Sequence, residues 1–390
     1  MIIERTLFAK IRPYFDSPEA IIITGMRRTG KTTLLRYIME SIKNKNKIFL
    51  DLENPLNQKY LEEKNYEKVS DNFKFLGLDV NKKAYVFLDE IQFVKSTPSV
   101  VKYLIDHYKI KFFLSGSASF YLKNLFSESL SGRKYIFELF PLSFREFLRL
   151  KGSKINLPQA QGKISEAQFY EINRYYDEFV LYGGFPGVVQ KDTAGEKKMA
   201  LEDIFSSYFQ LEVKQLGDFR KTNVMRDLIF LLMERVGSKI DIQKLSRELG
   251  VARETIYDYI AFLEQTYFIK LIRPFSRNRD SEIRATPKFY LCDTGLLNQF
   301  AKVSGGALFE NVVFLGLRQK GEINYYQRKN GPEIDFILNK KHAYEVKISP
   351  DETDLKRLAA TASELKLKNA TAISRRLSRI ENDVTYGFLL

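Results

Sequence analysis

Short apolar runs alternate with longer mixed segments over the first 140 residues. The runs lie at residues 21–24, 48–52, 84–89, 111–115 and 135–139, and each has a polar residue at its last position or the one before it. Continuous apolar strands are typical of a parallel sheet that helices cover on both faces. The pattern therefore predicts an α/β fold with a parallel sheet in this part of the chain.

The pattern changes after residue 140. Residues 141–221 have helical periodicity and many aromatic side chains, residues 222–280 contain a compact helical unit that ends in an apolar run, and strands return in residues 281–390. Because each segment differs from the next in periodicity, we predict four domains: 1–140, 141–221, 222–280 and 281–390.

The helical unit at residues 222–280 contains a helix-turn-helix pattern. Gly250 separates two helix-like segments, and apolar residues recur near helical spacing at Val251, Ile256, Ile260 and Leu263. Residues 266–275 suit a strand, as in the wing of a winged helix. The second helix is expected to present Arg253, Thr255, Tyr257 and Tyr259, beside the acids Glu254 and Asp258. The basic and hydroxyl side chains favour DNA contact, the acids oppose it, and a purely structural winged helix is the alternative.

Net charge, cysteine count and the lengths of the apolar stretches indicate which partners and which cellular compartment suit the chain. The 390 residues carry a formal net charge of +14, which suits a polyanion such as DNA, although general solubility accounts for the charge equally well. The single cysteine, Cys292, has no partner for an intramolecular disulfide and fits a reducing compartment. No signal-peptide pattern and no apolar stretch of about 18 residues is present, so we expect a cytoplasmic protein without membrane contact.

A phosphate-binding loop follows the first apolar run: residues 25–32 have the sequence G-x-x-x-x-G-K-T. Glycines let backbone N–H groups turn towards phosphate oxygens, and the start of the next helix adds partial positive charge. Lys31 is expected to reach the β- and γ-phosphates of ATP, and the Thr32 hydroxyl to bind Mg²⁺. The role of Arg27 stays open between nucleotide and a neighbouring subunit, as does that of Arg28. The expected nucleotide contacts are Gly25, Arg28, Thr29, Gly30, Lys31, Thr32 and Thr33.

The third and fourth apolar runs end in polar side chains suited to hydrolysis. Asp89 is expected to hold Mg²⁺, and Glu90 to polarise the attacking water. Ser115 and Ser117 are candidate sensors of the γ-phosphate, although small hydroxyl residues are common at strand ends. Arg133 is a candidate arginine finger that acts on a neighbouring subunit, or else an ordinary surface arginine.

A second group of chemically active residues lies in a predicted hairpin, residues 333–347. If the turn is residues 339–341, Leu338 faces His342, Asp335 faces Glu345 and Glu333 faces Lys347. Two opposed carboxylates are unfavourable unless a cation such as Mg²⁺ joins them, and Lys347 is placed to stabilise charge that develops on a phosphate. The alternative is an exposed hairpin with a Glu333–Lys347 salt bridge.

The arrangement of Asp335 opposite Glu345 and Lys347 resembles the core of restriction-endonuclease-like nucleases. That resemblance implies Glu310 as a further metal-binding acid on the preceding helix, so the expected metal ligands of this site are Glu310, Asp335 and Glu345. The motif is short and degenerate.

Nearly the whole chain resembles prokaryotic AAA-type ATPases that carry a C-terminal domain of unknown function of the 4143 type. The matching segments include Arg5 and residues 25–32, 51–54, 88–92, 115–117, 130–133, 141–147, 182–186, 289–296, 310, 333–335 and 345–347. The resemblance implies an ATPase core, a helical lid, a winged helix and a restriction-endonuclease-like α/β domain. For AAA ATPases it also implies self-association, up to a hexamer.

These features together favour an ATP-hydrolysing protein that binds DNA and carries a Mg²⁺-dependent nuclease-like domain, with a role in DNA processing. A rival from another class is a signalling or scaffolding ATPase whose C-terminal domain binds a partner without cleaving it. A third hypothesis is an ATP-switched DNA-binding regulator, which binds specific sequences and does not cut them.

Overall fold

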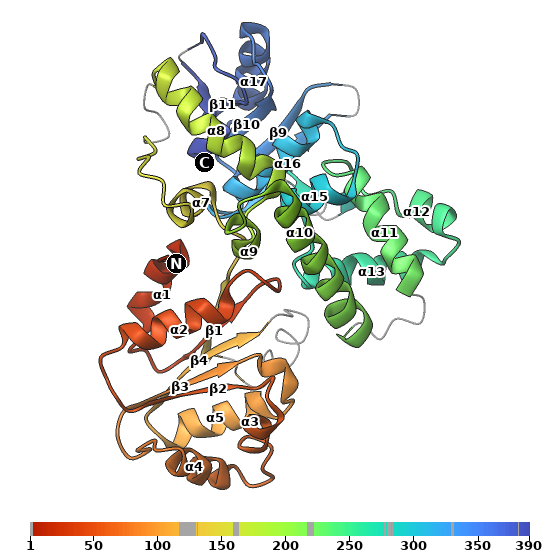
Figure 1. The fold of residues 1–390 in the computed structure, drawn as a ribbon. Helices are drawn as coiled ribbons and strands as arrows, with labels where there is room; N and C mark the ends of the chain where they lie inside the picture. Colours follow the sequence, from red (N-terminus) through yellow and green to blue (C-terminus); the bar gives the residue numbers. More distant parts are fainter. Residues whose placement is uncertain are drawn as a thin grey trace. The chain divides into compact units, whose positions relative to one another are not determined.

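The structure is a computed structural model that describes residues 3–116, 130, 132–158, 164–216, 222–276, 278, 282, 284–328, 331–380 and 382–390. Contacts between Cα atoms divide the chain into two units. The first unit is Met1–Phe140 with Gln265–Tyr267, and the second is Pro141–Glu264 with Phe268–Leu390. Figure 1 shows the helices and strands of the chain with their labels.

A five-stranded sheet forms the centre of the first unit, in the order β2-β3-β4-β1-β5. All four strand pairings are parallel. The strands are β1 (Ala20–Thr24), β2 (Lys47–Asp51), β3 (Ala84–Asp89), β4 (Ile110–Gly116) and β5 (Lys134–Glu138). The predicted α/β class with a parallel sheet is therefore confirmed.

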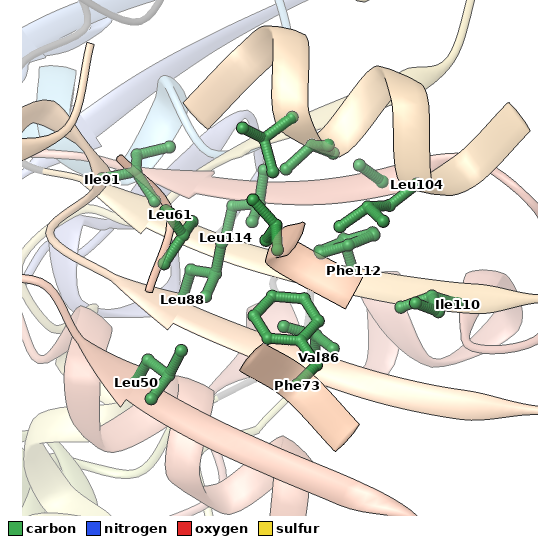
Figure 2. Packing of buried hydrophobic residues seen from close by; sticks show 14 of the residues in the cluster. Leu50, Leu61, Phe73, Val86, Leu88, Ile91, Leu104, Ile110, Phe112 and Leu114 are labelled. Atoms are coloured by element: carbon green, nitrogen blue, oxygen red, sulfur yellow. The ribbon is translucent and has the colours of Figure 1, made fainter. Parts of the chain in front are cut away.

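Helices cover both faces of this sheet because its central strands are apolar on both faces. Helices α1 (Thr6–Ile11) and α2 (Lys31–Ser41) pack on the face that includes Ile21, Ile23 and Phe87. Helices α4 (Tyr66–Phe75) and α5 (Thr97–His107) cover the other face, where Phe73 and Leu104 meet strand residues such as Val86 and Phe112 (Figure 2). A short helix, α3 (Pro55–Lys59), lies between β2 and α4 in the sequence.

Side chains cap the first turn of three of the helices that begin the second unit. Ser143, Ser165 and Thr193 each form a capping box with the acid or amide three residues later. The helices are α7 (Phe144–Leu150), α8 (Glu166–Tyr182), α9 (Pro186–Val189) and α10 (Ala194–Tyr208), which continues into a π-helix at Phe209–Leu216.

Three further helices form the helix-turn-helix region: α11 (Thr222–Glu234), α12 (Ile242–Leu249) and α13 (Arg253–Gln265). Gly250 ends α12 in the left-handed region, with φ 64°, which favours glycine. Ile256, Ile260 and Leu263 are buried as predicted, whereas Val251, expected in the same stripe, is only half-buried. Tyr259 is only 5% exposed, so the prediction that α13 presents it to DNA is wrong: its ring packs into the core of the unit.

A seven-stranded sheet completes the second unit, in the order β12-β11-β10-β9-β8-β6-β7. β6 follows the helix-turn-helix directly, and it pairs with β7 on one side and with β8 on the other. The sheet therefore runs across residue 280, where a domain boundary was predicted. The strands are β6 (Ile269–Pro274), β7 (Lys288–Leu291), β8 (Ile323–Gln327), β9 (Glu333–Leu338), β10 (His342–Lys347), β11 (Asn369–Ser374) and β12 (Val384–Tyr386).

Helices α15 (Thr294–Phe300), α16 (Gly305–Leu317) and α17 (Glu352–Glu364) accompany this sheet. The ring of Phe314 on α16 stacks on Tyr290 of β7, 4.6 Å between centroids, and Tyr290 lies 5.2 Å from Phe336 of β9. β7 therefore packs against β9 through side chains, although the two strands are not neighbours in the sheet. This contact brings the face of β7 that carries Tyr290 close to the predicted hairpin.

The carboxylate of Asp293 joins two distant segments of the second unit. It caps α15 by accepting from the N–H of Gly295 (2.8 Å) and Leu296 (3.3 Å), and it also accepts from the N–H of Gly184 (2.7 Å). Gly183 has φ +74°, and a side chain there would clash with the same carboxylate. Burial raises the pKa of Asp293 to about 6. The Gly-Gly pair between α8 and α9 thus has a structural reason.

Candidate nucleotide site and carboxylate centre

The phosphate-binding loop has the backbone that its glycines predict. Gly25 has φ +151°, and a Cβ atom there would lie 2.1 Å from the carbonyl oxygen of Leu139. Gly30 has φ +94° and directly precedes α2. The Arg5 guanidinium donates to the carbonyl of Thr29 in the loop (2.9 Å) and to that of Phe140 (2.7 Å). Arg5 in the N-terminal segment therefore links the phosphate-binding loop to Phe140 through hydrogen bonds.

Lys31 is held against the loop that precedes it. Its side chain is 5% exposed, and its Nζ donates to the carbonyls of Gly25 (3.0 Å) and Met26 (3.1 Å). Thr32 is half-buried, whereas Thr33 and Arg28 are exposed. A bound phosphate offers Lys31 stronger, charge-assisted hydrogen bonds than these carbonyls do.

Asp89 and Ser115 meet at the carboxyl ends of neighbouring strands. The Ser115 hydroxyl donates to Asp89 Oδ1, and both residues are buried. Glu90 follows in the left-handed region, with φ 50°, and its carboxylate accepts from Gln92 Nε2 at 2.5 Å. β1, β3 and β4 are adjacent and parallel, so these side chains lie at the same edge of the sheet as the loop after β1. Gln92 was not singled out from the sequence.

Arg133 lies at the other edge of that sheet. Its carbonyl accepts from the N–H of Ala20, the first residue of β1, whereas the phosphate-binding loop follows the last residue of β1. The length of β1, on the order of 16 Å, therefore separates them. The Arg133 guanidinium pairs with Asp106 at 2.8 Å and is partly exposed. Arg133 is thus placed away from its own phosphate-binding loop, and its role as an arginine finger for a neighbouring subunit stays a prediction. Ser117, the other candidate sensor of the γ-phosphate, lies outside the described residues.

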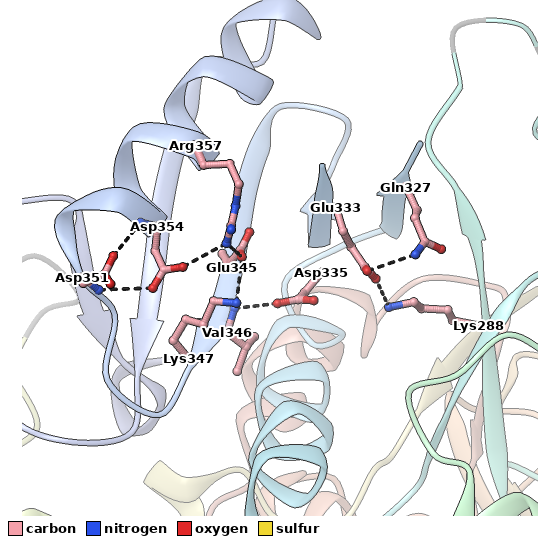
Figure 3. Close-up of polar contacts among 10 residues, drawn as sticks. All are labelled: Lys288, Gln327, Glu333, Asp335, Glu345, Val346, Lys347, Asp351, Asp354 and Arg357. Atoms are coloured by element: carbon pink, nitrogen blue, oxygen red, sulfur yellow. Dashed lines mark hydrogen bonds and ion pairs between the residues drawn. The ribbon is translucent and has the colours of Figure 1, made fainter. Parts of the chain in front are cut away.

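The predicted hairpin exists, and its register is confirmed where the strands pair: His342 opposite Leu338, Ala343 opposite Ile337 and Tyr344 opposite Phe336. Beyond Tyr344 the backbone pairing ends. Asp335 instead accepts from the backbone N–H of Val346 with its carboxylate, at 2.7 Å (Figure 3). The Asp335 side chain therefore occupies the place of a ladder hydrogen bond, close to Glu345.

Glu345 is buried between two cations. Its Oε1 accepts from Lys347 Nζ at 3.0 Å and from the Arg357 guanidinium of α17 at 2.9 Å. Its Oε2 is buried and has no hydrogen-bond partner among the residues that the structure describes. Lys347 pairs with Glu345 and Glu333 pairs with Lys288, so the alternative of a Glu333–Lys347 salt bridge is wrong.

Glu310 on α16 accepts from the Tyr290 hydroxyl at 2.6 Å. Burial raises the pKa of Glu310, and the nearby cation of Lys288 opposes that rise. Burial raises the pKa of Asp335 to about 7, and the charge of Glu310 adds to the effect. Glu310 and Asp335 are therefore close enough to repel each other, which favours a cation or a proton between them.

Glu310, Asp335 and Glu345 were predicted to bind one metal ion together, and their placement differs from this. Among the residues that the structure describes, no group of three or more His, Cys, Asp and Glu side chains is placed to hold a metal ion. The physical reason is that Glu310 is held by Tyr290, while Glu345 turns towards Arg357. Asp335 and the unpartnered Oε2 of Glu345 still fit Mg²⁺, which commonly takes one or two carboxylates beside water and substrate phosphates.

Glu310, Glu333, Asp335, Glu345 and Lys347 form what is called here the carboxylate centre. Lys288 is a further member of this centre that the sequence did not reveal. It lies on β7, is 6% exposed, and pairs with Glu333 at 2.5 Å (Figure 3). Burial lowers its pKa, but the charge of Glu310 and the contact with Glu333 more than offset this, so the pKa of Lys288 lies above its usual value. No pattern in the sequence indicates that β7 packs against β9.

The helix-turn-helix presents a mixed surface. Arg253, Glu254, Tyr257 and Asp258 are exposed on α13. An open cavity of about 650 Å³ lies between α12 and α13, lined by Ser246, Arg247, Gly250, Val251, Ala252, Thr255 and Tyr259. The surface therefore combines cations, acids and one large exposed ring.

Family models match three consecutive parts of the chain. Residues 17–148 match an AAA domain, residues 173–306 a domain of unknown function (DUF8612), and residues 305–386 another domain of unknown function (DUF4143). With the parallel sheet and the phosphate-binding loop, the first match makes the first unit a P-loop ATPase core of AAA type. A C-terminal α/β domain follows it.

Two curated relatives that cover most of the chain bear the name uncharacterized protein. One from Methanocaldococcus jannaschii is 28% identical and spans 89% of this chain and 80% of its own length. One from Haemophilus influenzae is 26% identical and spans 91% of this chain and 90% of its own length. Among solved structures, the Aeropyrum pernix ORC1 protein in complex with DNA covers 80% of this chain and 94% of its own, at 14% identity and a TM-score of 0.35. Drosophila ORC bound to GC-rich DNA and Cdc6 covers 75% of this chain and 91% of its own, at 11% identity and a TM-score of 0.23.

Helices in the described part of the chain are too short or too polar to cross a membrane.

Proposed function

We propose that the protein hydrolyses ATP, binds DNA and carries a Mg²⁺-dependent nuclease-like site, with a role in DNA processing. The proposal is supported by the presence in one chain of a phosphate-binding loop with two nearby acids and of a separate cluster of two acids and a lysine. The phosphate-binding loop lies at the same sheet edge as Asp89 and Glu90, and Asp335, Glu345 and Lys347 lie together in the second unit.

In the ATPase site, Lys31 would leave the loop carbonyls for the β- and γ-phosphates. Thr32 and Asp89 would hold Mg²⁺, which neutralises phosphate charge when bound. Glu90 would then orient the attacking water once its carboxylate leaves Gln92. Ser115, already bonded to Asp89, would sense the γ-phosphate through that contact.

In the carboxylate centre, Asp335 and Glu345 would hold Mg²⁺, with Glu310 as an outer acid. The cation would act as a Lewis acid on the phosphate. Lys347 would then move from Glu345 to the non-bridging phosphate oxygens, where charge grows as water attacks the phosphorus and the sugar oxygen leaves. DNA would reach the protein first through the basic residues of the helix-turn-helix, Arg247 and Arg253.

The test combines two measurements on one preparation: ATP turnover with and without DNA, and cleavage of duplex, branched and single-stranded DNA with Mg²⁺. We expect DNA to change the turnover rate and the DNA to be nicked. Asp335→Ala should abolish nicking and leave basal ATP turnover unchanged. Nicking that survives Asp335→Ala would remove the proposed nuclease site.

A second candidate is a signalling or scaffolding ATPase whose second unit binds a partner without cleaving it. One observation favours it: Glu345 is paired with Lys347 and Arg357, and Glu333 with Lys288, as in a structural ion-pair network. On that hypothesis ATP turnover ignores DNA and the DNA stays intact. An ATP-switched regulator instead predicts sequence-specific binding without nicks.

A further inference from the structure

The carboxylate centre is built from two parts of the second unit. Asp335, Glu333 and Glu345 come from the hairpin β9–β10, and Glu310 comes from α16. Lys288 and Tyr290 come from β7, a strand whose main-chain partners are β6 and the loop before α12. The centre therefore combines side chains of the hairpin and α16 with side chains of a strand whose backbone is bonded to the loop between α11 and α12.

β7 reaches the centre with alternate residues, which point to the same side of a strand. Lys288 pairs with Glu333 at 2.5 Å, and the Tyr290 hydroxyl donates to Glu310 at 2.6 Å. Gly237, in the loop that bonds to β7, lies against the same glutamate: a Cβ there would be 3.2 Å from Glu310 Oε1. Glu333 and Glu310 are thus both held by side chains of β7.

A buried ammonium group is costly unless anions surround it. Lys288 is 6% exposed and lies within the field of Glu310, Glu333 and Asp335. It already supplies positive charge to a group of acids that would otherwise attract a divalent cation. In the described part of the chain, Oε2 of Glu345 is a buried acceptor of the same centre without a hydrogen-bond partner, and a cation can still use it.

We propose that Lys288 is a built-in counter-ion of the carboxylate centre, which keeps its affinity for a free divalent cation low. This inference rests on the proposed nuclease-like site, because it assumes that the centre takes such a cation. Lys288 offsets part of the negative charge of the carboxylates. Bound nucleic acid adds the negative charge of its phosphates, so the centre binds its cation tightly only when nucleic acid is present. Lys288 is a positioning residue: it acts on the cation through the carboxylates.

The test measures Mn²⁺ binding to the full-length protein, free of nucleotide and DNA, by calorimetry. Binding that disappears in Asp335→Ala belongs to this centre. Lys288→Met should strengthen that Asp335-dependent binding at least about tenfold, because a positive charge that acts on Asp335 and Glu333 is removed. Lys288→Arg keeps the charge and should restore the wild-type affinity.

Lys340→Met is the matched control. Lys340 is also ion-paired, with Glu282 at 3.3 Å, and it lies at the turn of the same hairpin. We expect it to leave Mn²⁺ binding unchanged. Folding of each variant is checked by circular dichroism, and Tyr290→Phe provides a second variant that releases Glu310 without a change of charge, with a smaller rise in affinity.

Equal or weaker Asp335-dependent binding in Lys288→Met overturns the proposal, and so does the absence of such binding in both proteins. DNA cleavage on the same preparations separates this inference from the nuclease function. Binding that tightens in Lys288→Met without any cleavage rejects the nuclease function alone. Cleavage without an effect of Lys288→Met on Mn²⁺ binding rejects the counter-ion alone.

Discussion

Several single residues of the first unit have conformations that allow little substitution. Gly25 has no room for a side chain beside Leu139, Glu90 adopts a left-handed backbone, and Arg5 joins the phosphate-binding loop to Phe140. The catalytic motif thus depends on residues outside it, which fix the loop before a nucleotide arrives.

Gly25→Ala tests this dependence. The added Cβ would meet the Leu139 carbonyl oxygen at 2.1 Å, so the loop or β5 has to move. We expect loss of ATP binding and a fall of more than about 2 kcal/mol in the free energy of unfolding of the first unit. Gly187→Ala, where a Cβ meets nothing within 4 Å, is the control and should change neither quantity. Normal ATP affinity in Gly25→Ala would show that the loop is not held this way.

At the residue scale the sequence was informative where chemistry needs a fixed spacing. Lys31, Asp89 and Glu90 follow from motifs, and the structure places the acids at the sheet edge that carries the loop. Gln92 and Lys288 could not be found this way, because their contacts with Glu90 and Glu333 depend on side-chain direction and on strand packing.

At the scale of elements, apolar runs predicted strands well because a strand covered on both faces is apolar throughout. The run at residues 84–89 coincides with β3, and the other strands of the first unit begin within one residue of their runs. The neighbours of β6 and β7 were not predictable. Periodicity predicts which face of a strand is buried, but it does not predict which other strand pairs with it.

Asp293 makes the second unit sensitive to pH. Its pKa is about 6 in the folded chain against 3.8 for an unperturbed aspartate, so the folded state keeps a proton that the unfolded state loses. The free energy of unfolding should therefore fall as pH rises from about 4 to about 6, by up to roughly 3 kcal/mol.

Urea unfolding across this pH range checks the prediction, with wild type compared with Asp293→Asn. The stability of the wild type relative to Asp293→Asn should decline with rising pH, because asparagine does not titrate. Asp258→Asn, at an exposed site on α13, is the control. A constant difference between wild type and Asp293→Asn would contradict the account.

The helix-turn-helix makes a prediction about DNA. Arg247 and Arg253 are exposed on α12 and α13 and would contact phosphates. Replacing both by alanine should weaken duplex binding about tenfold or more at low salt and reduce the slope of log Kd against log salt concentration by about 2. Lys356→Ala, exposed on α17, is the control for loss of charge alone. An unchanged salt slope would point to a structural helix-turn-helix.

At the scale of the whole molecule, the open question is how copies of the chain cooperate. Arg133 cannot serve its own phosphate-binding loop, because the length of β1 lies between them. If it is an arginine finger, ATP turnover per chain should rise with protein concentration, and Arg133→Ala should lower turnover at least tenfold at high concentration without loss of ATP binding.

Asp106→Ala is the matched control, since it breaks the Arg133 ion pair and keeps the arginine. Its turnover should remain near that of the wild type. Turnover in Arg133→Ala equal to wild type at every concentration would make Arg133 an ordinary surface arginine.

The central claim is that the first unit hydrolyses ATP with Lys31 and Glu90. Its most direct test is ATP binding and turnover by wild type, Lys31→Ala and Glu90→Gln. We predict that Lys31→Ala loses binding, and that Glu90→Gln binds ATP with wild-type affinity but turns it over at least a hundredfold more slowly. Turnover by Glu90→Gln at the wild-type rate, or ATP binding that ignores Lys31→Ala, would contradict the account.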